Sequence, residues 1–169
     1  EAKKNKWGIV ISDPSPEEEV PTLLRNPRWV TIIQPVLEFL GLTPGYRELD
    51  ISIPFLIFFS IFFGILIGDA GYGLLYILLT FLLQKKMGSN PEIRPVLPLF
   101  YVLSSCAVAW GILSGTFFGQ EWLLSLGFKP LVPQLNDAGF MQTFCFFIGA
   151  LHLSLAHAWR GYVKLPSLT

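Results

Sequence analysis

The sequence predicts an all-α integral membrane protein: a helical bundle of about four transmembrane helices, two short ones forming a hairpin and then two full spans. Only 14% of the 169 residues are charged and 52% are hydrophobic, whereas a soluble domain carries about 25% charged residues. The charge deficit is concentrated in three apolar blocks, residues 51–83, 96–118 and 140–159. Each block reaches the length of about 18 residues that indicates a membrane-spanning helix.

The region before the first block is expected to lie outside the membrane. Residues 1–28 are polar and punctuated by prolines, which predicts an extended cytoplasmic linker. Residues 29–50 are predicted to form an interfacial amphipathic helix and a turn, since Val30, Ile33, Leu37 and Leu40 share one helical face. Packing of this helix on a neighbouring subunit is the open alternative.

Residues 51–84 are predicted to form a short helical hairpin broken near residues 68–73. A single helix over this block would be roughly 50 Å long, well above the thickness of the hydrocarbon. Three glycines interrupt it at Gly68-Asp-Ala-Gly-Tyr-Gly, and glycine permits a backbone break. One long tilted helix is the alternative.

The basic residues favour the hairpin, because positive charges gather in cytoplasmic loops. They cluster before the first block, between the first two blocks and after the last, at Arg25, Arg28, Arg47, Lys85, Lys86, Arg94, Arg160 and Lys164. A common side for all three clusters requires an even number of crossings in residues 51–84. The chain is then a multi-pass protein of the cell membrane with a cytoplasmic N-terminus.

The remaining chain is divided by the same criteria. A transmembrane helix is predicted at 95–119, an outer loop at 120–139, a second full span at 140–160 and a truncated cytoplasmic loop at 161–169. Glu1 in place of methionine, and an end at Thr169 just past an apolar span, lead us to expect that both termini are cut from a longer protein.

Small residues recur at every fourth position of the second apolar block. In a helix such a stripe lets another backbone approach closely. The predicted helix-packing residues in this block are Ala107, Gly111, Gly115 and Gly119. Gly64 and Gly68 repeat the same spacing once in the first block and are predicted to pack in the same way.

Two polar residues inside the apolar blocks are candidates for an ion path. Asp69 is the only charge within residues 51–83, and an intramembrane carboxylate indicates function by default. At a break it would instead cap the second helix, which is the interpretation we favour. His152 is expected to hydrogen-bond a neighbouring helix rather than to shuttle protons. It points about 140° away from His157 on a helix, which disfavours a shared metal site.

Several activities find no support in the sequence. The net charge is zero, so nothing indicates nucleic-acid binding. Cys106 and Cys145 lack metal-ligand spacing. There is no HExxH or GxSxG motif. We therefore expect no metal, no cofactor and no enzymatic activity of this segment itself, with the lipid bilayer as one partner.

Five motifs, in order, resemble subunit I (subunit a) of V-type and A-type rotary ATPases, in the N-terminal part of its membrane domain. The most specific is a phenylalanine-rich helix that ends in Gly68, Asp69, Gly71, Tyr72 and Gly73. The others are Pro21-Thr-Leu-Leu-Arg-Asn-Pro, Gly45-Tyr-Arg-Glu-Leu-Asp, Trp110-Gly-Ile-Leu-Ser-Gly with Phe118-Gly119, and Ile148-Gly-Ala-Leu-His-Leu.

The resemblance implies a membrane stator subunit of a complex that is an ATP-driven translocase of protons or sodium ions. The implied partners are a rotating proteolipid ring and, through a missing N-terminal domain, peripheral stalk subunits. The family's channel arginine has no counterpart here: Gly149 stands where it would fall, and Arg160 lies at a helix end. A fragment of a secondary ion transporter with a broken helix is the alternative function.

Overall fold

The computed structural model describes residues 2–5, 8, 13, 15, 25–42, 50–119, 127 and 129–164. Within these ranges the chain is helical and contains no β-strand. Most of the predicted linker, Arg47 and residues 120–126 and 165–169 lie outside the described residues. In chain order the elements are α1 (Ala2–Asn5), α2 (Arg28–Thr31), α3 (Gln34–Phe39), α4 (Ser52–Ile67), α5 (Ala70–Met87), α6 (Leu97–Ser114), the 3-10 helix η1 (Pro133–Asn136) and α8 (Ala138–Lys164).

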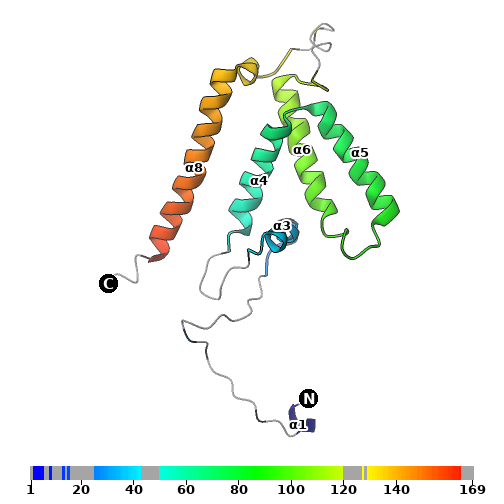
Figure 1. The fold of residues 1–169 in the computed structure, drawn as a ribbon, viewed down its shortest axis with the longest axis vertical. Helices are drawn as coiled ribbons and strands as arrows, with labels where there is room; N and C mark the ends of the chain where they lie inside the picture. The colour runs from blue at the N-terminus through cyan, green and yellow to red at the C-terminus, as the bar shows by residue number, and fades with distance from the viewer. Residues whose placement is uncertain are drawn as a thin grey trace.

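Three helices form the main bundle (Figure 1). The chain rises along α4, bends by 119° at a short break and descends along α5. Helix α6 then rises between these two helices and packs against both. We call the end where α4 meets α5 the break end. The opposite end, where α5 ends and α6 begins, carries Arg28, Lys85, Lys86 and Arg94 and is called the basic end.

Helices α2 and α3 lie across the basic end (Figure 1). Two turn residues separate them, and Pro35 occupies the first turn of α3, where its missing N–H costs no hydrogen bond. The buried side chains of Ile33 and Leu37 form one cluster with Leu56, Leu99 and Leu103. One face of the predicted amphipathic helix therefore packs on this chain's own bundle.

Every fourth residue of α4 is buried, beginning at Ser52 and continuing through Leu56, Ser60 and Gly64. A Cβ atom added to Gly64 would lie 3.1 Å from the carbonyl oxygen of Cys106 on α6. Lipid tails are as apolar as leucine, so helices in a bilayer associate through close packing rather than through hydrophobic burial. The small residues of α4 provide that closeness.

The contact between α5 and α6 is closer still. A Cβ atom on Gly73 would lie 2.7 Å from both the amide nitrogen and a side-chain carbon of Val108. Ala107 is fully buried beside it. Near the basic end, the Tyr101 hydroxyl and the Gln84 side chain join the same two helices by a hydrogen bond of 2.8 Å.

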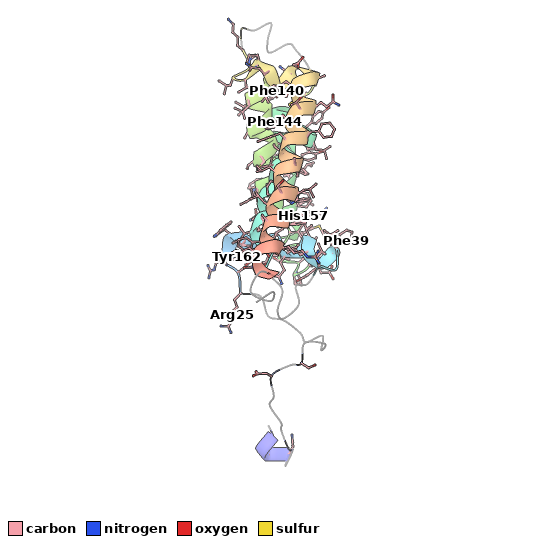
Figure 2. All side chains as sticks on the ribbon, turned by 90° about the vertical axis from the view of Figure 1, so that its left-hand side faces the viewer. Arg25, Phe39, Phe140, Phe144, His157 and Tyr162 are labelled. Atoms are coloured by element: carbon pink, nitrogen blue, oxygen red, sulfur yellow. The ribbon has the colours of Figure 1, made fainter. Side chains whose placement is uncertain are left out.

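Helix α8 stands beside this bundle and contacts it mainly through aromatic rings. His152 stacks on Phe58 of α4 with ring centroids 4.3 Å apart, and Phe144 meets Trp110 of α6 at 5.8 Å. Figure 2 shows α8 in front, with Phe140 and Phe144 near its upper end and Tyr162 near its lower end. Only 6% of the residues in its apolar window are buried.

Two helices, α6 and α8, are each long and apolar enough to cross a membrane, and α4 with α5 meets the criterion only as a bent pair. Two or three spans are therefore supported by length and composition, and four spans remain a prediction. Helix α6 ends at Ser114, five residues before the predicted end, because Gly115 takes a left-handed conformation there. Helix α8 begins at Ala138, before the predicted Phe140.

The close contact at Gly73 predicts that a glycine-to-alanine change within a helix lowers the stability of this protein instead of raising it. Gly73→Ala should lower the midpoint of thermal unfolding of the purified protein in detergent, because the new methyl group overlaps the Val108 backbone and such overpacking costs about 1–3 kcal/mol. Gly149→Ala on α8 is the control, since its Cβ would meet nothing within 4 Å. Helix propensity alone would make both changes stabilising by up to about 1 kcal/mol. Equal midpoints for the two variants would contradict the packing.

Candidate functional site at the Asp69 junction

Two residues, Gly68 and Asp69, form the break between α4 and α5. Gly68 ends α4 in a left-handed conformation with φ of 60°, which a residue with a side chain rarely adopts. Asp69 follows in an extended conformation and is the N-cap of α5, whose first residue is Ala70. An apolar helix thus stops and a second one starts without any intervening loop.

The Asp69 side chain accepts three backbone hydrogen bonds and is only 5% exposed. Its Oδ1 atom accepts from the N–H groups of Tyr72, at 3.0 Å, and Phe118, at 2.9 Å. Its Oδ2 atom accepts from the N–H of Gly119 at 2.7 Å. The first of these bonds caps α5, and the other two hold the segment that follows α6. One carboxylate therefore ties together two parts of the chain about 50 residues apart.

Thr116 makes a second set of bonds to the same break. Its hydroxyl donates to the carbonyl of Gly68, and its own carbonyl accepts from the N–H of Ala70 at 3.0 Å. The hydroxyls of Thr116 and Ser114 lie 2.8 Å apart. We call residues 68–70 together with residues 114–119 the Asp69 junction.

The junction continues into the segment before α8. The Asn136 side chain donates to the carbonyl of Ser114 at 2.8 Å, and the N–H of Val132 donates to the carbonyl of Leu113 at 2.8 Å. Carbonyls at the end of α6, which have no partner within the helix, are satisfied in this way.

Glycine is required at the junction by close approach. A Cβ atom on Gly111 would lie 1.9 Å from the amide nitrogen of Ala70, so α6 crosses the break in backbone contact. A Cβ atom on Gly71 would lie 2.7 Å from the ring of Phe118. That ring also meets Tyr72 edge to face, with centroids 5.3 Å apart. In the motif Gly68-Asp-Ala-Gly-Tyr-Gly, the first glycine ends α4 and the aspartate caps α5. The other two glycines allow close approach of Phe118 and Val108.

The predicted glycine stripe is not continuous in the structure. Ala107 and Gly111 lie on α6 and face the bundle. Gly115 instead ends the helix with φ of 73°, and Gly119 lies beyond it, where a Cβ atom would meet nothing within 4 Å. The fourfold spacing holds only while the chain is helical, so Gly119 contributes its N–H to Asp69 rather than a packing surface.

The two ion-path candidates lie apart. No contact joins Asp69 and His152 within the described residues. His152 contacts Phe58 of α4, and Ile67 at the break end lies nine positions further along the helix, roughly 14 Å away. His152 stacks on the ring of Phe58, and no hydrogen bond from its side chain is found among the described residues, so the expected bond to a neighbouring helix stays a prediction. His157 bonds the carbonyl of Leu153 in its own helix at 2.8 Å.

The arrangement is that of a structural cap. A carboxylate offers about four acceptor positions, and three of those on Asp69 are occupied by backbone N–H groups. Among the described residues it has no cationic partner, and no cluster of three or more histidine, cysteine, aspartate or glutamate side chains could hold a metal ion there.

A second aspartate lies at the start of α4 and is also held by hydrogen bonds. Burial raises the pKa of Asp50, but hydrogen bonds from the Ser52 hydroxyl, the Ser52 N–H and the Asn26 side chain outweigh it. The pKa of Asp50 is therefore below its ordinary value.

Sequence reasoning missed Ser114, Thr116 and Phe118 as partners of the break. Their signal is weak but present: Ser114-Gly-Thr follows a long apolar helix, where glycine typically ends the helix and hydroxyls bond free backbone groups.

Removal of the Asp69 carboxylate should destabilise the protein more than removal of an ordinary helix cap. Asp69→Ala loses three charge-assisted bonds and should cost about 3 kcal/mol or more in the free energy of unfolding. Asp69→Asn should fall in between, because its amide keeps an acceptor but turns an NH₂ group toward Gly119. The control is Asp137→Ala, which removes one exposed bond to the N–H of Phe140 and should cost about 1 kcal/mol. Unfolding in mixed micelles, followed by circular dichroism, measures all three; a smaller loss for Asp69→Ala than for Asp137→Ala would contradict the junction.

Comparison with known proteins shows the family. The chain is 37% identical over 172 aligned positions to V-type ATP synthase subunit I 1 of Treponema pallidum, an alignment that covers 92% of this chain and 27% of the relative. It is 34% identical to V-type ATP synthase subunit I of Borreliella burgdorferi, covering 93% of this chain and 27% of the relative. The corresponding A-type subunit of Pyrococcus horikoshii is 33% identical, with 92% and 23% covered.

The chain spans about a quarter of the length of these relatives. No protein-family model matches it. No solved structure matches it. The alignments nevertheless extend over nearly the whole chain, including the break at Asp69, and every relative described above is a subunit of the same kind. The chain therefore belongs to the subunit I family of V-type and A-type ATP synthases.

Proposed function

We propose that this segment is the scaffold of a membrane stator in a V/A-type rotary ATPase that translocates protons or sodium ions. It would support the ion path beside a rotating proteolipid ring without carrying the moving charge itself. Family membership supports the role in a rotary ATPase. The names of the relatives do not favour the alternative of a secondary transporter, and among the described residues there is one broken helix pair, not two.

The observation that carries the proposal is the binding of Asp69 by three backbone donors. A group that passes ions must exchange partners, whereas this carboxylate accepts three N–H groups that close the break between two helices. Helices α4 and α6 contain no ionisable carboxylate, lysine or arginine at all. These features favour rigidity over ion exchange.

The proposed partners follow from the exposed surfaces. Most of α8 is exposed along its apolar length, which leaves room for further helices of the stator and for the proteolipid ring. Peripheral stalk subunits would bind through a domain N-terminal to this segment.

We further propose four crossings with the N-terminus in the cytoplasm. Helices α4 and α5, of 16 and 18 residues, would be roughly 24 and 27 Å long, slightly shorter than the hydrocarbon of about 30 Å. The start of α4 and the end of α5 both lie at the basic end of the bundle (Figure 1), which supports a hairpin. The basic residues at that end favour the cytoplasmic side.

Cysteine labelling in intact cells tests this topology. With Cys106 and Cys145 replaced by alanine, a cysteine at Asp50 or Ser89 should be protected from a membrane-impermeant maleimide, and one at Lys129 should react. Permeabilised cells are the control, in which all three sites should react. A reaction at only one of Asp50 and Ser89 in intact cells would instead mean that α4 and α5 form a single bent span.

Ion pumping by the assembled complex tests the scaffold role. His152→Phe keeps a ring on Phe58 and removes the titratable nitrogens, so ATP-driven pumping per assembled complex should be unchanged. Asp69→Asn should reduce the amount of assembled complex but not the rate per complex. His152→Ala, which removes the stacking ring, is the matched control and should lower assembly. Normal assembly with lost pumping in His152→Phe or Asp69→Asn would assign that residue to the ion path.

A further inference from the structure

The segment at residues 28–42 has more apolar surface than the bundle covers. Val30, Ile33 and Leu37 are buried. Ile33 and Leu37 pack with residues of α4 and α6. By contrast, Phe39 is 88% exposed and Trp29 is 57% exposed, and Leu42 is exposed as well. Leu40, predicted to share the face of Val30, Ile33 and Leu37, is also exposed, because α3 ends at Phe39 and the face does not continue to it. The bundle therefore covers only part of the apolar surface of this segment, and the exposed apolar side chains have no partner among the described residues.

The depth of the segment in the bundle limits what can cover it. Leu37 packs with Leu56 and Leu99, which lie in the first two turns of α4 and α6. Residues 28–42 therefore lie level with the ends of the apolar helices, where the hydrocarbon of a bilayer would give way to headgroups.

Other aromatic side chains mark the same level on a separate element. Trp159 and Tyr162 of α8 are 57% and 71% exposed. Figure 2 shows Tyr162 and Phe39 at nearly the same height, with Arg25 below them, away from the bundle. Tryptophan and tyrosine are enriched where the membrane meets water.

The charges at this end fit an anionic surface. Among the described residues the basic side chains there are Arg25, Arg28, Lys85, Lys86, Arg94 and Arg160, and the acidic ones are Glu38, Asp50 and Glu92. Each basic residue near an anionic leaflet contributes about 1 kcal/mol of attraction. A protein partner would have to reach both the α2–α3 segment and α8, whereas a lipid leaflet surrounds both at one depth.

We infer that residues 28–42 form a lipid-binding surface. Phe39, Trp29, Leu40 and Leu42 insert at the boundary between the acyl chains and the headgroups of an anionic leaflet, and Arg25 and Arg28 contact the phosphates. An amphipathic helix binds a membrane in this way when its apolar face enters this boundary. The inference does not depend on the proposed stator function, because it concerns only the depth of one segment.

Photocrosslinking in native membranes tests the inference. The benzophenone amino acid p-benzoylphenylalanine replaces Phe39, whose exposure makes the fold insensitive to the change, or Glu38, an exposed polar neighbour on the same helix. After irradiation, mass spectrometry of the full-length subunit should find phospholipid adducts at position 39 with a yield about fivefold above that at position 38. Adducts enriched in phosphatidylglycerol over phosphatidylethanolamine are expected.

Three other outcomes would overturn the inference. A protein adduct at position 39 would make the surface a subunit interface. Equal lipid yields at positions 38 and 39 would mean that α3 does not turn Phe39 toward the lipid in preference to Glu38. No adduct at either position would place the segment in water. A second arm uses Arg28→Glu in vesicles of phosphatidylethanolamine and phosphatidylglycerol: the phosphatidylglycerol fraction of the adducts at position 39 should fall, and an unchanged fraction would contradict the proposed phosphate contact.

Discussion

Most of the bundle depends on how one buried carboxylate is compensated. An ionised group of this kind is costly in an apolar environment unless donors surround it, and Asp69 meets the requirement with backbone N–H groups from α5 and from the segment after α6. Because two of the three donors come from the distant segment, compensation of the charge also sets the position of α6. Thr116 reinforces the same geometry with bonds to the residues on either side of Asp69. Local capping and long-range assembly are therefore one set of interactions.

The close approach of α6 to the break also requires residues without side chains at the points of contact. Gly111 allows the α6 backbone to touch Ala70, and Gly71 and Gly73 keep α5 clear of Phe118 and Val108. In a solvent made of lipid tails the gain from burying a leucine is small, so contact between backbones is the available source of stability. The buried positions of α4, α5 and α6 are accordingly rich in glycine, alanine and serine.

Sequence patterns predict the parts of this fold that rest on local chemistry. Asp69 between glycines in an apolar block predicts a helix break with a capping carboxylate, and the break is where the glycines indicate. What local patterns cannot provide is the partner at the other side of the break, because Thr116 and Phe118 become neighbours of Asp69 only through the path of α6. The same limit explains Gly119: its spacing fits a helical stripe, but the helix has already ended at Ser114. It also explains His152, whose ring contact with Phe58 depends on the placement of a separate helix.

The separation of Asp69 from its donors along the chain has a consequence for biosynthesis. Asp69 leaves the ribosome 49 residues before Phe118 and 50 before Gly119. During that interval the carboxylate has only its own helix to satisfy it, and water or lipid headgroups must supply the remaining donors. Helices α4 and α5 therefore cannot have their complete set of contacts at Asp69 before the segment after α6 has been synthesised. The junction can thus form only late in synthesis, because the carboxylate at position 69 precedes two of its donors by about 50 residues.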